Sequence, residues 1–157
     1  MAISVAILTV SDRCFRGETS DESGPLIHRL LDTTLDVDIV AEKLAPDEQE
    51  KIRDTLKRWC DECGIDLVLT TGGTGFSPRD VTPAATRAII ERETGGITEA
   101  IMAKGLRSTP HAMLSRAVAG IRGRTLIINL PGAPRAVEEG LRVIIPALPH
   151  AIEILKG

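Results

Sequence analysis

Hydrophobic residues fall in short runs along this chain, and amphipathic stretches of helical length separate them. Four apolar runs predict strands. The last two are almost continuously apolar, which is typical of strands buried on both faces of a parallel sheet. The four runs span residues 3–10, 37–44, 65–71 and 125–130.

Helical periodicity fills the intervals between these runs. It is clearest over 47–63, where Ile52, Leu56, Trp59 and Cys63 share one face of a helix. Strands that alternate with helices predict an α/β protein, with a parallel sheet, right-handed crossovers and helices on both faces. Since no repeat or linker interrupts the 157 residues, we expect one domain over 1–157. The other predicted helices span residues 23–31, 83–93, 97–106, 135–145 and 146–156.

The ends of the predicted strands indicate where a ligand would bind. The carboxyl ends of parallel strands meet at one edge of a sheet, and ligands bind just beyond that edge. Four loops are therefore expected to share this edge, which we call the strand-end rim. They span residues 11–24, 45–48, 72–80 and 131–135.

The third of these loops is the most informative segment of the chain. A buried strand ends in Thr70-Thr71-Gly72-Gly73-Thr74-Gly75. Three glycines in four positions let backbone N–H groups approach an anion closely, and threonine hydroxyls flank them. We therefore predict a phosphate site at Thr71, Gly72, Gly73, Thr74 and Gly75, with a purely structural turn as the alternative. The loop lacks the Gly-Lys-Ser/Thr of a Walker A motif and the third glycine of a dinucleotide fingerprint.

Two aspartates lie at strand ends on the same rim. Asp80 precedes Thr82-Pro83, a helix start with Thr82 as the expected N-cap and Pro83 in the first turn. Asp47 precedes another helix, so either acid could serve only that helix's N-terminus. Together, however, two carboxylates would repel a phosphate unless a divalent cation lies between them. The pairing therefore predicts Mg²⁺, held by Asp47 and Asp80, and a nucleotide-like substrate.

The remaining loops supply further candidates. Ser11 and Asp12 end the first strand and begin a long polar loop, which could be a ribose or phosphate contact or an ordinary surface loop. Ser115 and Arg116 could bind phosphate through a hydroxyl and a guanidinium. Pro131 and Gly132 shape a rigid turn after the last strand, where a structural role and ligand contact are both open.

Composition and charge narrow the class of ligand. Apolar residues make up 43% of the chain and charged residues 26%, which is typical of a globular protein. A net charge of −3 and only 2% aromatic residues argue against nucleic-acid binding. No acid lies between Glu99 and Glu138, whereas six basic residues do. This asymmetry favours a polyanionic small molecule, with an incidental basic surface as the alternative. The six are Lys104, Arg107, Arg116, Arg122, Arg124 and Arg135.

Cysteine usage and the N-terminal sequence predict a cytoplasmic protein. Three cysteines make no disulfide framework, and we see neither a signal peptide nor an apolar run long enough to span a membrane. We interpret Cys60-x-x-Cys63 as two buried core cysteines on a helix, because no second pair accompanies them. His28, His111 and His150 are scattered, and we assign none of them to chemistry.

The quoted motifs, taken together, resemble a known family. The chain is similar to molybdopterin adenylyltransferases of the MoaB/Mog family, and especially to the G domain of gephyrin and its plant counterpart. The segments that carry the likeness span 8–12, 46–48, 70–83, 113–116, 120–123 and 126–132.

This resemblance implies a fold, an assembly and an activity. The fold is a three-layer α/β/α sandwich with a mostly parallel sheet, usually assembled as a homotrimer. The reaction transfers AMP from Mg-ATP to the terminal phosphate of molybdopterin, releasing pyrophosphate, and the product passes to a molybdenum insertase.

The resemblance also implies roles for residues of this chain. Asp47 and Asp80 match two required acids, and the loop Gly72–Gly75 matches the cradle for the pterin phosphate. Ser11 and Asp12 match the nucleotide side, while Ser115 and Arg116 lie in a segment that lines the substrate cleft.

Two other functions remain open at the level of sequence. One is a paralogue that binds molybdopterin without adenylylating it, although the presence of both aspartates argues against an inactive enzyme. The other is a scaffold or oligomerisation module, as in chains that fuse this domain to others. We expect this less, because the sequence stops at Gly157 with no linker or second domain. Tungsten in place of molybdenum also remains open.

Overall fold

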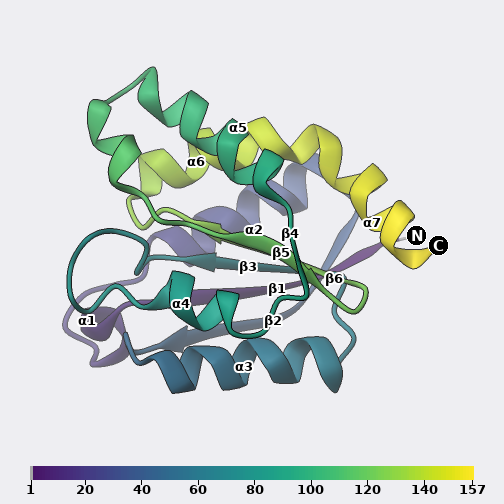
Figure 1. Ribbon diagram of the computed structural model, residues 1–157, viewed down its shortest axis with the longest axis horizontal. Coiled ribbons are helices and arrows are strands. Elements are labelled where there is room, and N and C mark those ends of the chain that lie inside the picture. The colour runs from purple at the N-terminus through teal and green to yellow at the C-terminus, as the bar shows by residue number, and fades with distance from the viewer. Residues whose placement is uncertain (1) are drawn as a thin grey trace.

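The computed structural model describes residues 2–157 and contains one six-stranded sheet between two layers of helices (Figure 1). The order across the sheet is β2-β1-β3-β6-β5-β4. The first four strands in that order are parallel, whereas β5 and β4 each run antiparallel to their neighbour. The strands are β1 Ile3–Val10, β2 Val37–Ala45, β3 Leu67–Thr71, β4 Arg92–Glu93, β5 Ala119–Arg122 and β6 Thr125–Leu130.

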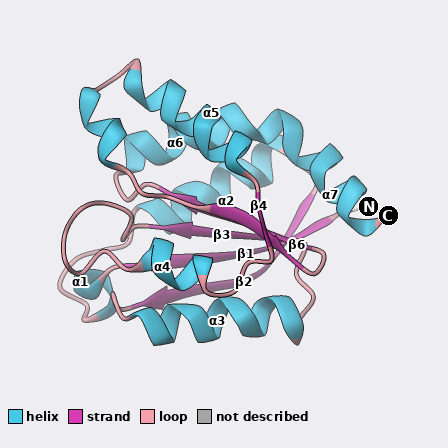
Figure 2. Ribbon diagram, viewed as in Figure 1, coloured by secondary structure: helices cyan, strands magenta, loops and turns pink. Residues whose placement is uncertain are grey.

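Helices cover both faces of the sheet (Figure 2). The α helices are α1 Asp12–Phe15, α2 Ser23–Thr34, α3 Gln49–Asp61, α4 Thr82–Arg87, α5 Gly95–Leu106, α6 Pro134–Ile144 and α7 Leu148–Lys156. Two short 3₁₀ helices are η1 Pro110–Leu114 and η2 Ile145–Ala147.

Alternation along β1 shows how the layers are built. Val5 and Ile7 point into a core formed with α2, α6 and α7, whereas Ala6 and Leu8 point into a second core formed with α3 and α4. All four side chains are fully buried or nearly so, because a central parallel strand is covered on both faces. The three-layer α/β/α sandwich implied by the resemblance is therefore confirmed.

One predicted helix is wrong in its second half. The pattern favoured a helix over 83–93, but α4 ends at Arg87 and the chain then pairs with β5, where the Glu91 amide donates to the Ile121 carbonyl at 2.8 Å. The antiparallel strands β4 and β5 were not predicted from the sequence. They are two and four residues long, and the pairing of β5 with β6 and of β4 with β5, rather than local periodicity, creates them.

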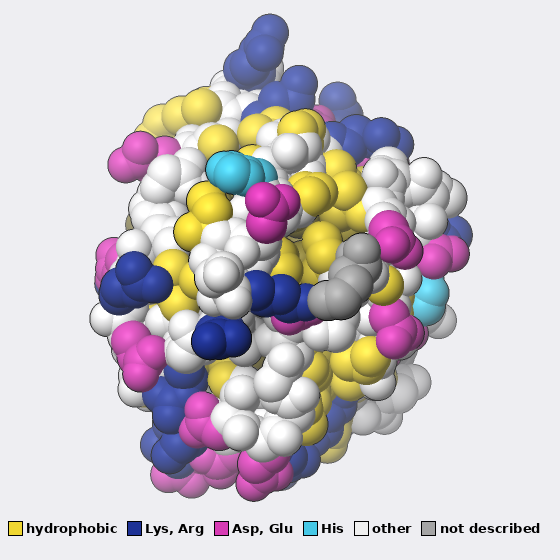
Figure 3. Space-filling model, turned by 90° about the vertical axis from the view of Figure 1, so that its right-hand side faces the viewer, with side chains coloured by type: hydrophobic (Ala, Val, Ile, Leu, Met, Phe, Trp, Pro, Cys, Tyr) yellow, Lys and Arg dark blue, Asp and Glu magenta, His cyan; other side chains and the backbone are white. Residues whose placement is uncertain are grey.

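The end of the molecule that carries both termini lies far from the strand-end rim (Figure 1). Basic and acidic side chains are intermingled there with hydrophobic ones (Figure 3). None of the helices in residues 2–157 is long and apolar enough to cross a membrane.

Candidate functional site

The four strand-end loops converge, as the sequence predicts. A Cβ atom at Gly72 would overlap the carbonyl oxygen of Val10 at the end of β1, and one at Gly132 would lie 3.4 Å from the Gly72 Cα. The Ser23 hydroxyl also donates to the Gly132 carbonyl at 2.8 Å. The loops after β1, β3 and β6 therefore pack backbone against backbone, and at Gly72 this close approach leaves no room for a side chain.

The glycine loop has a conformation that other residues rarely adopt. Gly72 and Gly73 have φ angles of 94° and 68°. A Cβ at Gly73 would overlap the Thr82 hydroxyl and lie 3.0 Å from Asp47 Oδ1. The Thr82 hydroxyl donates to the Gly72 carbonyl at 3.0 Å. The buried Thr82 side chain therefore braces the loop. Thr82 is also the first residue of α4, so its predicted role as N-cap is wrong.

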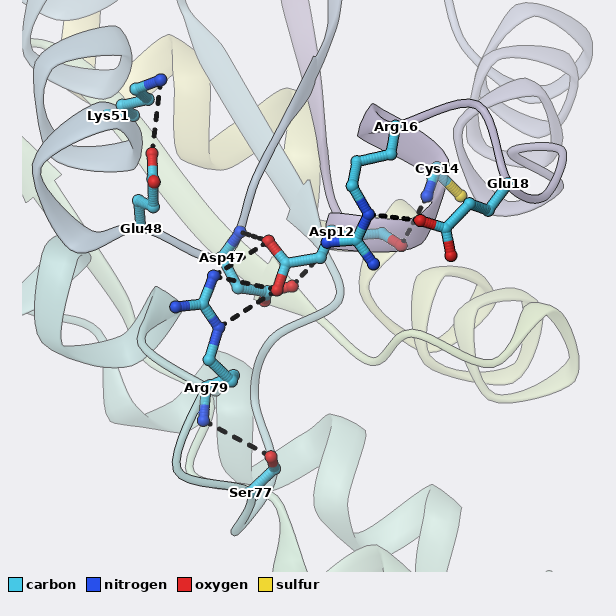
Figure 4. Close-up of polar contacts among 10 residues, drawn as sticks. Asp12, Cys14, Arg16, Glu18, Asp47, Glu48, Lys51, Ser77 and Arg79 are labelled. Atoms are coloured by element: carbon cyan, nitrogen blue, oxygen red, sulfur yellow. Dashed lines mark hydrogen bonds and ion pairs between the residues drawn. The ribbon is translucent and has the colours of Figure 1, made fainter.

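Asp12 and Asp47 are joined by two hydrogen bonds, each from the backbone amide of one residue to the carboxylate of the other (Figure 4). The Asp12 amide donates to Asp47 Oδ2 at 2.9 Å, and the Asp47 amide donates to Asp12 Oδ1 at 2.9 Å. Asp47 is therefore not the side-chain cap of α3, whose N-cap is Glu48. This exchange joins the loop after β1 to the loop after β2. Ser11 stands just before it, where its hydroxyl accepts from the Cys14 amide and caps α1.

Arg79 reaches across from the loop after β3 to the same pair (Figure 4). Its Nη2 donates to both carboxylate oxygens of Asp12 at 3.1 and 2.9 Å, and its Nε donates to Asp12 Oδ2 at 3.1 Å. We did not predict a role for this arginine from the sequence. Its position next to Asp80 in Ser77-Pro78-Arg79-Asp80 is the signal that could have identified it.

Asp80 borders the glycine loop at Gly75. Its Oδ2 accepts the Ser77 amide at 3.0 Å and would lie 3.0 Å from a Cβ at Gly75. Arg116 ties this segment down, because its Nε donates to the Gly75 carbonyl at 3.0 Å and its Nη2 to the Asp80 carbonyl at 2.8 Å. We had predicted that the Arg116 guanidinium binds phosphate, but two of its N–H groups donate to the loop itself.

The electrostatics of the two paired aspartates differ. Partial burial, followed by the negative charges of Asp12 and Asp80, raises the pKa of Asp47 above its ordinary value. The Asp47 amide, followed by the bond and charge of Arg79, holds the pKa of Asp12 below its ordinary value. Asp47 therefore carries a desolvated carboxylate that nearby cationic charge would stabilise.

The donor set at this position fits Mg²⁺. Mg²⁺ is usually bound by one or two carboxylates that act together with substrate phosphates. Asp47 and Asp80 each present a carboxylate oxygen to the glycine loop. Residues 2–157 contain no cluster of three or more His, Cys, Asp or Glu side chains that could hold a metal on its own.

A cleft of about 490 Å³ lies beside the loop, between α5, η1 and α6. Its lining includes five of the predicted site residues, namely Thr74, Gly75, Ser115, Pro131 and Gly132. The Thr71 hydroxyl donates to the Pro131 carbonyl at 2.5 Å and so fixes that turn. The buried side-chain amide of Asn129 donates to the hydroxyls of Thr70 and Thr86 at 2.9 and 3.0 Å, which braces the base of the cleft.

Some of the sequence candidates do not meet at this site. Arg122 lies in the β5–β6 hairpin at the far end of the sheet, where it pairs with Asp61 at the end of α3 at 2.8 Å, and Arg124 lies in the turn of the same hairpin. The acid-free segment is therefore not a single basic surface facing the site. Cys60 is partly buried, and burial raises the pKa of its thiol to about 11. Cys63 is exposed, so the prediction of two buried cysteines is wrong.

A family model described as "Probable molybdopterin binding domain" matches residues 6–150. The chain belongs to this family. Among solved structures, the molybdopterin biosynthesis enzyme MoaB from Thermus thermophilus is 48% identical, with a TM-score of 0.93 over 99% of this chain and 97% of that one.

The curated relatives that match this chain include proteins of similar length and much longer ones. Molybdopterin adenylyltransferase from Helicobacter pylori is 39% identical over 161 residues, covering 99% of this chain and 89% of the relative. Gephyrin from Dictyostelium discoideum is 44% identical over 162 residues and covers 98% of this chain. This chain spans only 22–26% of the length of gephyrin and the other long relative that it matches.

Proposed function

We propose that this protein is a molybdopterin adenylyltransferase, which transfers AMP from ATP to the terminal phosphate of molybdopterin. The main support is one juxtaposition: Asp47 and Asp80 border the Gly72–Gly75 loop, and Thr74 and Gly75 of the same loop line the cleft. The similarity to the Helicobacter pylori enzyme, over 89% of its length, supports the same activity.

The transfer breaks one phosphorus–oxygen bond and forms another. An oxygen of the pterin phosphate attacks the α-phosphorus of ATP, and the bond to the bridging oxygen breaks with its electron pair, releasing pyrophosphate. Both reactants are anions, so the protein acts mainly by positioning and by neutralising charge. Backbone amides of Gly73, Thr74 and Gly75, with the hydroxyl of Thr74, bind the pterin phosphate, whereas the Gly72 amide donates to the Leu130 carbonyl at 3.3 Å. Ser11 and Asp12 bind the nucleotide.

The other predicted residues orient these groups. Thr71 fixes the turn that contains Pro131 and Gly132, and Ser115 joins these residues in lining the cleft for the pterin. Arg116 keeps Gly75 and Asp80 in register. Asp47 and Asp80 would hold Mg²⁺, which supplies charge neutralisation at the nucleotide phosphates when it is bound.

A turnover assay with purified protein, molybdopterin, ATP and Mg²⁺ tests this proposal. We expect adenylylated pterin and pyrophosphate in equal amounts, and neither product when EDTA is added. The variant Asp80→Ala should retain its far-ultraviolet circular dichroism and lose turnover. Tight pterin binding by the wild-type protein without any product would contradict the proposal and favour a non-catalytic paralogue.

The assembly and context of this activity form a separate part of the proposal. The resemblance to the family supports a homotrimer, a cytoplasmic location and transfer of the product to a molybdenum insertase. Light scattering coupled to gel filtration tests the assembly, since a trimer would have three times the chain mass of 16.8 kDa. A monomer at micromolar concentration would contradict it.

A further inference from the structure

The cleft contains one acidic side chain that the proposed reaction does not use. Glu139, in the second turn of α6, is the only acid among the described residues that line it. The rest of the lining is mainly apolar, with hydroxyl groups and two basic side chains, Arg135 and His111. A carboxylate in such a lining is costly unless it has partners.

Two elements hold this carboxylate in place. The Ser108 hydroxyl, just after α5, lies 3.0 and 2.9 Å from the two Glu139 oxygens, and Arg135 Nε donates to Oε1 at 3.3 Å. Only 20% of the Glu139 side chain is exposed, whereas the Arg135 side chain is 87% exposed. One hydroxyl proton and one N–H do not saturate a carboxylate, which offers about four acceptor positions. Glu139 therefore keeps free acceptor capacity on a fixed side chain.

The packing of α5 against α6 puts apolar walls beside this group. Gly140 has no side chain, and a Cβ there would lie 3.0 Å from Ile101 Cγ2, so the two helices approach closely at this point. Ile101 and Met102 of α5 line the same cleft as Glu139. The lining also includes Thr74 and Gly75 of the phosphate loop. The cleft thus combines a phosphate loop, apolar walls and one oriented carboxylate.

We infer that Glu139 recognises the pyrimidine edge of the pterin ring. This inference rests on the proposed function, which makes a pterin phosphate the ligand of the cleft. A pterin presents an exocyclic 2-amino group and the adjacent ring N3–H, two nearly parallel donors that match the two oxygens of a carboxylate. A site that accepts such a donor rejects an analogue that lacks it, because a buried acceptor is then left unpaired. Glu139 is therefore a specificity-determining residue for the ring.

The test compares two ring systems that differ at this edge. 6-Hydroxymethylpterin carries the 2-amino group, whereas 6-hydroxymethyllumazine carries an oxygen there. Their affinities are measured by titration calorimetry on the wild-type protein, Glu139→Gln and Glu138→Gln. Glu138 is the matched control, because it is the adjacent α6 residue, lies outside the cleft lining, is about half exposed and pairs with Arg142.

The wild-type protein and Glu138→Gln should bind the pterin about 10- to 100-fold more tightly than the lumazine. Glu139→Gln should bind both within about threefold of each other, because a neutral amide replaces one acceptor by a donor. Ser108→Ala, which removes the hydroxyl but keeps the carboxylate, should reduce the preference partially. A Glu139→Gln protein that retains the full preference, or a wild-type protein that shows none or binds neither ring, overturns the inference.

Turnover measured in parallel separates this inference from the proposed function. We expect Glu139→Gln to raise KM for molybdopterin about 10-fold or more while KM for ATP changes less than about twofold. Adenylylation by the wild-type protein together with an unchanged KM in Glu139→Gln would overturn the inference alone. A wild-type protein that makes no adenylylated product would overturn the proposed function, while the ring preference would still decide the role of Glu139.

Discussion

Asp12 and Asp47 each accept the other's backbone amide on a carboxylate oxygen, at 2.9 Å in both directions. The exchange clamps the loops after β1 and β2 to each other. It also leaves Asp47 Oδ1 facing Gly73, next to the loop proposed to bind phosphate. The position of the carboxylate is therefore set by backbone contacts, so substitutions can remove its charge without dismantling its surroundings.

Asp47→Asn tests the charge of this side chain. We expect a loss of about 10²- to 10³-fold in kcat, the magnitude typical of removing one electrostatic contact at a reacting centre. Because burial already disfavours the charged form of Asp47, the melting temperature at neutral pH should not fall. Steady-state kinetics and thermal melts check both expectations, and a variant with wild-type turnover would exclude a role for this charge.

The acidic limb of the pH profile of kcat/KM should depend on two charged neighbours of Asp47, namely Asp12 and Arg79. Partial burial raises the pKa of Asp47, so activity that needs the ionised form should decline, as pH falls, at a higher pH than an ordinary aspartate with pKa 3.8 would give. The Asp12 charge also raises this pKa, whereas the Arg79 charge lowers it. Asp12→Asn should therefore shift the acidic limb of kcat/KM to lower pH, and Arg79→Ala should shift it to higher pH.

Comparing the two variants with each other controls for protonation of ATP, which is the same in both assays. Shifts in the same direction would show that a group other than Asp47 controls the limb.

Gly73→Ala and Gly123→Ala form a matched pair. Both residues have a positive φ, 68° and 59°, so alanine costs each about 1–2 kcal/mol of backbone strain. Only at Gly73 does the new Cβ collide with its surroundings, at the Thr82 hydroxyl and Asp47, whereas at Gly123 nothing lies within 4 Å. We expect Gly123→Ala to remain active with a modestly reduced free energy of unfolding, and Gly73→Ala to lose turnover. Denaturant titration and kinetics on both proteins provide the check.

Arg116→Ala and Arg122→Ala separate the two ends of the basic segment. Arg116 bonds to the carbonyls of Gly75 and Asp80 at the site, so its loss should lower kcat and raise KM for molybdopterin. Arg122, in the distant β5–β6 hairpin, pairs with Asp61 at the end of α3 and donates to the Ile89 carbonyl at 2.8 Å, so its loss should lower the melting temperature by a few degrees and leave kinetics unaltered. Equal kinetic effects of the two substitutions would contradict the division made by the structure.

Much of the fold could be predicted because the central strands are covered on both faces. β1 reads as a mainly apolar run and β3 and β6 as almost continuous ones, and their carboxyl ends define the strand-end rim without further information. The antiparallel edge could not be predicted in the same way. β4 is only Arg92–Glu93, both exposed, and β5 contains Gly120, against which Ile90 and the Arg92 carbonyl pack closely. Tertiary pairing selects these strands.

The candidate site, too, could be predicted from the sequence only in part. Glycines and acids at strand ends can be located from sequence, because their spacing and the topology of the sheet place them on one rim. The bonding of Asp12 to Arg79 and the packing of Glu139 against Ser108 depend on loops and helices that meet only in three dimensions. Glu139 did leave a sequence signal, since it follows closely on the long acid-free segment that ends at Glu138.

Transfer of an adenylyl group to the pterin can be tested by following the α-phosphorus of ATP. The protein is incubated with Mg²⁺, molybdopterin and ATP labelled either at the α- or at the γ-phosphorus, and the pterin is isolated chromatographically. We expect label in the pterin from α-labelled ATP and none from γ-labelled ATP, whose label should leave in pyrophosphate. Label in the pterin from the γ position, or from neither position, would contradict adenylyl transfer.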